Sequence, residues 1–267
     1  MSGIKNLAGQ TLWYGVSSIF ARFLNYLLTP YLTYKLSGSG FGEMSLVYAA
    51  IPFLNTLFLF GVETAYFRYI QQDQYKNEIY NTLSISLFSS TFSLTALLLI
   101  FNKSFAHLIS IQDHPEYVTL SAFIICFDAL SALPFAKLRH EGRPVKFAFV
   151  RVTGIILNIG IIYFFLSVCP ALLKKNSNSP LLIIYNKDFG VGYILLANVI
   201  QSFYQLIILN KELFSFQWKF NFTMWKEVMI YALPLAIAGF AGMINETFDR
   251  IMLGWWAPVQ SLSLIHI

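Results

Sequence analysis

The sequence contains little charge for its length. Only 12% of its 267 residues are Asp, Glu, Lys or Arg, which is about half the share in a typical soluble domain. In contrast, 57% of the residues are apolar and 17% are aromatic. One water-soluble core of this size does not hold so many large apolar side chains. The composition therefore excludes a disordered chain and an ordinary cytosolic enzyme, and it indicates an integral membrane protein.

Cysteine and histidine are also scarce. The two cysteines, Cys126 and Cys169, lie in or beside apolar stretches and form neither a disulfide framework nor a metal-ligand motif. The sequence also lacks a Gly-rich phosphate loop and a nucleophile motif. These absences predict a protein without metal, cofactor or enzymatic activity. The net charge is +5. In a membrane protein such an excess of Lys and Arg indicates which loops are cytoplasmic, and it is not evidence of nucleic-acid binding.

Seven apolar segments are long enough to cross the hydrocarbon core of a bilayer as helices. Their apolar runs are continuous and do not alternate, which argues against a transmembrane barrel. The sequence therefore predicts an all-α integral membrane protein, a polytopic helical bundle of about seven transmembrane helices. The expected spans are Leu12–Tyr34, Met44–Phe67, Ile79–Phe101, Val118–Leu138, Phe147–Val168, Phe189–Leu209 and Val228–Leu253.

The distribution of cations over the short loops predicts the orientation of the chain. If the amino terminus is cytoplasmic, ten Lys and Arg residues fall on the cytoplasmic side and five on the opposite side. Cytoplasmic loops carry the excess of Lys and Arg in membrane proteins. We therefore expect a multi-pass protein with a cytoplasmic amino terminus.

A weak internal repeat predicts the domain organisation. Residues 20–25 resemble residues 240–245, and both segments run in the same direction across the membrane, as in transporters with two parallel halves. We expect a six-helix lobe in residues 1–222 and the first helix of a second lobe in residues 223–261. Residues 262–267 match the translation of a sequencing adapter, so we expect the natural protein to continue beyond Ser261.

Ionisable residues inside the expected spans are the candidate functional residues. A charged side chain at bilayer depth costs roughly 2.5–3.5 kcal/mol and usually faces a partner or a watery cavity. Arg22 lies near the middle of the first span and shares a helix face with Asn25. Because Arg binds phosphate through two hydrogen bonds, this pair predicts an anion site. A structural ion pair of Arg22 with Asp128 or Glu63 is the alternative.

Two further ionisable residues lie deep in the fourth and fifth spans. Asp128 is at the middle of its span and is a candidate for proton or sodium coupling, or else the counter-ion of Arg22. Arg151 is about one turn inside its span, after a basic loop. Its guanidinium either contacts substrate or extends to the cytoplasmic headgroups.

The remaining ionisable residues favour local ion pairs. Glu63 is expected to pair with Arg68 near the end of the second span. Glu246 and Arg250 are four residues apart, in the favourable order for a helical pair. One carboxylate, Asp249 or Glu246, is then left as a candidate for ion coupling.

Four motifs, in this order, resemble the polysaccharide biosynthesis flippases, the oligosaccharide (O-antigen) branch of the multidrug/oligosaccharidyl-lipid/polysaccharide exporter superfamily. The first is an Arg-bearing helix followed by Pro30 and the Gly-rich turn at residues 37–43. The second is Phe60–Tyr69, the third is Leu133–Arg143, and the fourth extends from Tyr231 to the Asp249-Arg250 pair.

This resemblance implies two six-helix lobes around a central cationic cavity in a bacterial inner membrane. It implies that undecaprenyl-pyrophosphate-linked glycan is moved to the outer leaflet by alternating access. Arg22 and Arg151 then face the pyrophosphate, and Asp128, Glu246 and Asp249 are candidates for coupling to H⁺ or Na⁺. The alternatives are a multidrug or cation antiporter of the same superfamily, whose cavity is expected to be acidic, and a membrane-embedded glycan transferase.

Overall fold

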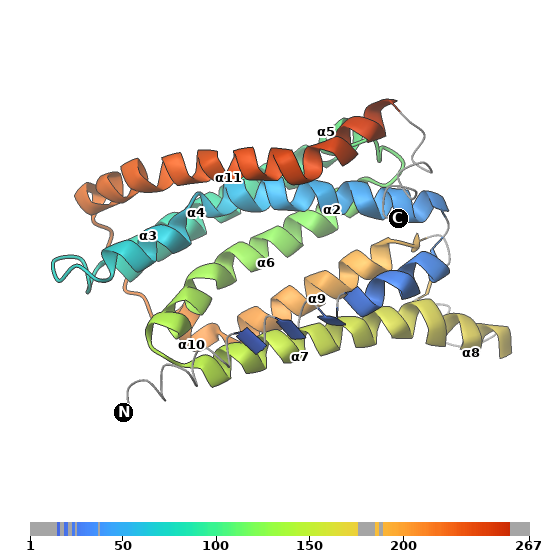
Figure 1. Ribbon diagram of the computed structural model, residues 1–267, viewed down its shortest axis with the longest axis horizontal. Coiled ribbons are helices and arrows are strands. Elements are labelled where there is room, and N and C mark those ends of the chain that lie inside the picture. The colour runs from blue at the N-terminus through green and yellow to red at the C-terminus, as the bar shows by residue number, and fades with distance from the viewer. Residues whose placement is uncertain are drawn as a thin grey trace.

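The protein is a bundle of antiparallel helices (Figure 1). The computed structural model describes residues 15–16, 19–20, 23–24, 26–36, 38–175, 185–186 and 189–256, without the side chains of residues 175, 245–251, 253 and 254. The long elements are α2 (Gly38–Leu59), α4 (Ile79–Ile100), α6 (Pro115–His140), α7 (Pro144–Tyr163), α9 (Gly192–Ile208) and α11 (Phe222–Trp256). The short ones are α3 (Val62–Tyr69), α5 (Asn102–Leu108), η1 (Phe164–Val168), α8 (Cys169–Lys175) and α10 (Asn210–Leu213).

Five helical segments are long and apolar enough to cross a membrane, and they confirm an all-α polytopic membrane protein. They are Gly38–Tyr69, Ile79–Ile100, Pro115–His140, Pro144–Lys174 and Phe222–Ile244. The expected sixth span corresponds to α9, which is apolar but has only 17 residues. Of the expected first span, residues 26–35 are described as one helical run.

Successive connections lie at alternate ends of the bundle (Figure 1). One end holds residues 70–78, 141–143 and 209–221, and we call it the α10 end. The other end holds α5 and α8, and we call it the α5 end. This alternation is the up-and-down arrangement that the sequence predicts for consecutive spans.

Helix α6 is the centre of the bundle. In the most apolar 18-residue stretch of α6, 72% of the residues are buried, whereas the corresponding share in the other four spans is 22–33%. It packs against α9, α4 and α2, while α11 packs along α2. Pro115 and Pro144 occupy the first turns of α6 and α7, where the missing N–H breaks no helical hydrogen bond.

The second span differs from the single helix expected at residues 44–67. Helix α2 begins at Gly38, so most of the expected Gly-rich turn is helical. The span is broken between α2 and α3, where Phe60 and Gly61 have φ angles of 34° and 76°. A Cβ atom on Gly61 would lie 2.7 Å from the carbonyl oxygen of Ala232. The close crossing of α11 therefore requires glycine at this left-handed position.

Candidate functional site

Asp128 is placed at mid-length of the central helix α6, where its side chain is half-buried. Two polar groups from other helices lie near its carboxyl group, although neither forms an ion pair with it among the described residues. They are the hydroxyl of Ser202 on α9 and the guanidinium of Arg151 on α7. A carboxyl at this depth requires such partners because the surrounding hydrocarbon supplies none. Residues that are far apart in the chain thus form one polar group inside the bundle.

Arg151 lies against α6 and is exposed at the surface of the bundle. Its guanidinium carbon is 4.4 Å from the ring centroid of Phe135 and 5.8 Å from that of Phe147. Both distances are within the range of cation–π attraction, which is about 6 Å. The two aromatic rings therefore hold the Arg151 side chain within the span, near Asp128.

The interface between α7 and α9 continues this polar region. Arg151, Gly154 and Asn158 share one face of α7, because they are three and four residues apart. A Cβ atom on Gly154 would lie 2.8 Å from Nε2 of Gln205, so the glycine makes room for that buried amide. Asn158 is 4% exposed, and its Nδ2 has no hydrogen-bond partner among the described residues. A buried amide donor without a partner in the protein can donate a hydrogen bond to a water molecule or to a polar ligand.

The expected Glu63–Arg68 pair is not formed. Arg139 of α6 donates a hydrogen bond to Glu63 instead, and the guanidinium of Arg68 lies 4.1 Å from the ring centroid of Tyr231 on α11. Positions 63 and 68 are five residues apart, which places their side chains on different faces of α3. Arg139 also lies 5.8 Å from the ring centroid of Phe147. The guanidinium groups of Arg139 and Arg151 thus both lie near the aromatic rings at the α6–α7 contact.

Comparison with known protein families identifies the chain. The model of the family described as polysaccharide biosynthesis protein matches residues 7–263, which is nearly the whole sequence. The chain belongs to the polysaccharide biosynthesis protein family. No curated protein and no solved structure gives a match.

One charged cluster of this polysaccharide biosynthesis protein was not anticipated from its sequence. Glu212 of α10 has a side chain that is only 4% exposed, and it accepts hydrogen bonds from Arg143 at 2.7 Å and Lys146 at 2.6 Å. Burial raises the pKa of Glu212, but the hydrogen bonds and charges of Lys146 and Arg143 outweigh this effect and lower the pKa below its ordinary value. Through these two hydrogen bonds, Glu212 links the α6–α7 loop and the start of α7 to α10, which follows α9. The sequence signal that could have indicated this burial is weak, because Glu212 follows Asn210 and Lys211 and only Leu213 beside it is apolar.

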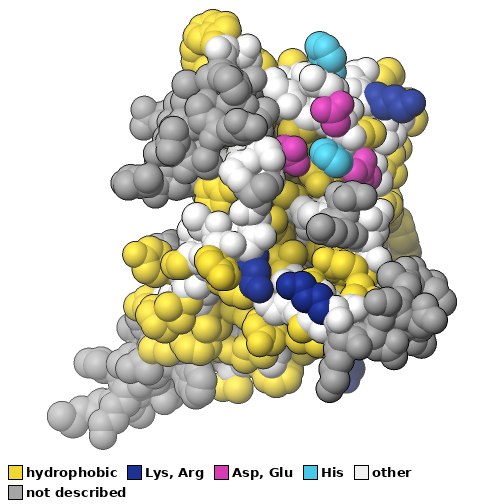
Figure 2. All heavy atoms as spheres, turned by 90° about the vertical axis from the view of Figure 1, so that its right-hand side faces the viewer, with side chains coloured by type: hydrophobic (Ala, Val, Ile, Leu, Met, Phe, Trp, Pro, Cys, Tyr) yellow, Lys and Arg dark blue, Asp and Glu magenta, His cyan; other side chains and the backbone are white. Residues whose placement is uncertain are grey.

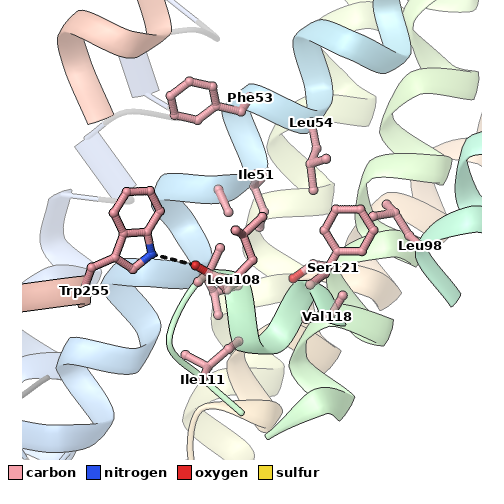
Figure 3. Close-up of a pocket in the computed structure, with 13 residues that line it drawn as sticks. Ile51, Phe53, Leu54, Leu98, Leu108, Ile111, Val118, Ser121 and Trp255 are labelled. Carbon is pink, nitrogen blue, oxygen red and sulfur yellow. Dashed lines mark hydrogen bonds between the residues drawn. The ribbon is translucent and has the colours of Figure 1, made fainter. Parts of the chain in front are cut away.

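An apolar cavity lies near the α5 end, between α2, α5, α6 and α11 (Figure 3). Its volume is 280 Å³, and its lining is almost entirely aliphatic and aromatic. Trp255 borders it and donates an indole hydrogen bond of 2.7 Å to the carbonyl oxygen of Leu108. The cavity is suited to a hydrocarbon chain and lacks groups that bind a charged head.

Several of the predicted site residues lie outside the described part of the structure. Arg22 and Asn25 are among them. Glu246, Asp249 and Arg250 are on α11, but their side chains are not described. Of the predicted cavity and coupling residues, the structure thus brings together Asp128 and Arg151.

Proposed function

We propose that this polysaccharide biosynthesis protein is a flippase that moves undecaprenyl-pyrophosphate-linked glycan across the bacterial inner membrane by alternating access. Arg151, with Arg22 and Asn25 of the first span, binds the pyrophosphate. Asp128, with Glu246 or Asp249, couples the movement to H⁺ or Na⁺. The protein transports and does not catalyse a covalent reaction.

The observation that carries this proposal is an arginine, Arg151, that is exposed within a membrane-spanning helix. An arginine that faced only acyl chains at this depth would cost several kcal/mol. Arg151 instead lies against the rings of Phe135 and Phe147, it is near Asp128, and part of the residue is exposed. This arrangement is expected at the wall of a water-filled passage. Guanidinium groups bind pyrophosphate oxygens through paired hydrogen bonds.

The distribution of charge supports a cytoplasmic amino terminus. Among the residues with described side chains, nine Lys and Arg residues lie at the α10 end and three at the α5 end. Figure 2, which views the α5 end, shows acidic and histidine side chains beside a few cations. Because Lys and Arg are concentrated on the cytoplasmic side, the α10 end is cytoplasmic in this proposal. Lipid-linked glycan then enters from that side.

The test is replacement of Arg151 in cells whose surface glycan depends on this protein. We expect Arg151→Ala to reduce surface glycan about tenfold or more and to cause lipid-linked precursor to accumulate, because one phosphate ligand is lost. Arg151→Lys keeps the charge but loses the paired geometry, so it should retain partial export. Ile156→Ala, at an exposed apolar position on the same helix, is the control and should export normally.

Three outcomes distinguish the alternatives. Normal export by Arg151→Ala, at an unchanged amount of protein in the membrane, contradicts the anion site. Loss of glycan without accumulated lipid-linked precursor favours a glycan transferase, because the block then precedes the finished intermediate. Loss of resistance to cationic compounds with intact glycan favours a multidrug antiporter.

A further inference from the structure

A second cavity, which is polar, lies at the α10 end and has a volume of 680 Å³, within the range of about 300–1,000 Å³ that is usual for ligand sites. Three parts of the chain enclose it: the connection from α3 to α4, the last turns of α6, and the segment between α10 and α11. Its charged lining residues are Lys76, Lys137, Lys219, Glu78 and Glu141, together with His140.

Both carboxylates of this cavity are already engaged by neighbouring groups. Glu78 accepts a hydrogen bond of 2.9 Å from the side-chain amide of Asn221. Glu141 accepts one of 3.2 Å from Arg143 and lies 3.9 Å from the ammonium of Lys137. Both carboxylates thus have hydrogen-bond partners within the fold, and the three lysines of the lining outnumber its two carboxylates, so the cavity keeps an excess of positive charge.

Two of its cations are available to a ligand. Lys76 and Lys219 are exposed, and neither forms an ion pair with another described residue. Lys137 is held more firmly, because it donates a hydrogen bond of 2.6 Å to the Ser215 hydroxyl and lies 4.4 Å from the ring centroid of Tyr80. An anion can thus bind to Lys76 and Lys219 without breaking a contact that holds the fold together.

The segment Phe214–Phe222 indicates the depth at which this cavity lies. Aromatic and polar residues alternate along it without exception. Its polar residues Ser215, Gln217 and Lys219 line the cavity. The side chains of Phe214, Trp218, Phe220 and Phe222 are 44–80% exposed. Exposed aromatic residues at the end of a spanning helix are typical of the headgroup layer of a bilayer.

The cavity is separate from the site around Arg151. Lys137 and Glu141, four residues apart, share one face of α6. Phe135, whose ring contacts Arg151 of α7, is two residues from Lys137 and therefore points to the opposite face of the helix. The transport site and the cavity thus lie on opposite sides of the central helix.

We propose that this cavity binds the phosphate headgroup of an anionic phospholipid of the surrounding leaflet. Lys76 and Lys219 supply ammonium groups to the phosphodiester, and the aromatic side chains of Phe214–Phe222 lie among the adjacent lipids. Basic pockets between transmembrane helices bind anionic headgroups by this chemistry. The site is independent of the proposed flippase activity.

The experiment measures lipid retention by the chain in nanodiscs that contain phosphatidylglycerol and phosphatidylcholine, with native mass spectrometry as the readout. The double variant Lys76→Gln, Lys219→Gln should lower the apparent affinity for phosphatidylglycerol about 10- to 30-fold, because each cation near the surface contributes about 1 kcal/mol. Phosphatidylcholine, which has no net charge, should not be retained by either protein.

The matched control is Lys211→Gln, Lys226→Gln. It removes the same charge from exposed lysines of the α10 end that do not line the cavity, and it should retain phosphatidylglycerol like the unmodified chain. The variant Lys76→Arg, Lys219→Arg should also retain it, which excludes misfolding as the cause of a loss. An equal loss in both Gln variants, or retention by the first, overturns the proposal. Preferential retention of a polyprenyl phosphate over phosphatidylglycerol overturns the assignment to a bilayer phospholipid.

Discussion

Glu212 shows how a single buried carboxylate can organise one end of the bundle. Its two oxygens are used separately, one by Arg143 and one by Lys146. Its backbone carbonyl accepts a hydrogen bond of 2.6 Å from Tyr80 of α4. One residue therefore connects α10 with the α6–α7 loop and with α4. Removing its charge leaves Lys146 without its carboxylate partner and Arg143 with Glu141 alone.

We expect Glu212→Gln to lower the free energy of unfolding by about 1–3 kcal/mol at neutral pH, the cost of losing hydrogen bonds to charged groups. Because the fold lowers the pKa of Glu212, its charged form stabilises the protein above the ordinary pKa of 4.5. This stabilisation is lost as the pH falls below 4.5 through the folded pKa. Thermal unfolding of both proteins across this range measures the difference, which should shrink in acid.

Asp73→Asn is the control for this measurement, since Asp73 is an exposed carboxylate in the connection between α3 and α4. It should unfold like the unmodified chain at every pH. A Glu212→Gln variant with unchanged stability at neutral pH would show that the buried ion cluster contributes nothing to the fold.

The sequence locates charges but not their partners. The depth of Asp128 and Arg151 follows from the apolar runs around them, and the structure places them together. Helical periodicity could also have separated Glu63 from Arg68. The actual partner of Glu63 is Arg139, 76 positions away, and only the packing of α3 on α6 brings them together. Local spacing contains no information about such a contact.

At the level of elements, the break between α2 and α3 depends on Gly61. Its φ angle of 76° is in the left-handed region, and the carbonyl of Ala232 lies where a side chain would begin. Both conditions act on the same residue, so α11 can cross α3 closely only if position 61 lacks a Cβ atom. Gly160 of α7 has neither constraint, because a Cβ atom added there would meet nothing within 4 Å outside its own helical turn.

The two glycines provide a matched test. Gly61→Ala should lower the free energy of unfolding by more than about 1 kcal/mol, since it combines left-handed strain with a backbone clash. Gly160→Ala should be neutral or stabilise by about 0.5–1 kcal/mol, because alanine favours the helix. Thermal unfolding in detergent compares them. Equal effects of the two substitutions would mean that the crossing of α3 and α11 does not constrain position 61.

The central place of α6 could not be predicted from composition. In a soluble protein the apolar face of a helix points to the core, but lipid is as apolar as a helix interface. All five long spans have mean hydropathies between 1.8 and 2.2, although their buried shares differ from 22% to 72%. Hydropathy therefore predicts which segments cross the membrane. It does not predict which of them the others surround.

At the level of the whole molecule, the fold class and the family could be predicted from the sequence. A long apolar segment in lipid must form a helix, because only a helix satisfies all its backbone hydrogen bonds within the segment. The structure and the family match agree with the predicted all-α membrane protein. The short connections also fix the alternation of spans between the two ends (Figure 1). The orientation of the two ends in the membrane depends instead on the distribution of charge between them.

The charge distribution predicts that the α10 end is cytoplasmic, and cysteine labelling tests this directly. Lys103 lies at the α5 end and Lys211 at the α10 end, and both are exposed. In intact cells a membrane-impermeant maleimide should label Lys103→Cys, and it should label Lys211→Cys only after the membrane is opened. The unmodified chain serves as the control and should stay unlabelled, because Cys126 and Cys169 are buried. The reverse labelling pattern would place the nine cations of the α10 end outside, and glycan would then enter the proposed passage from the wrong side.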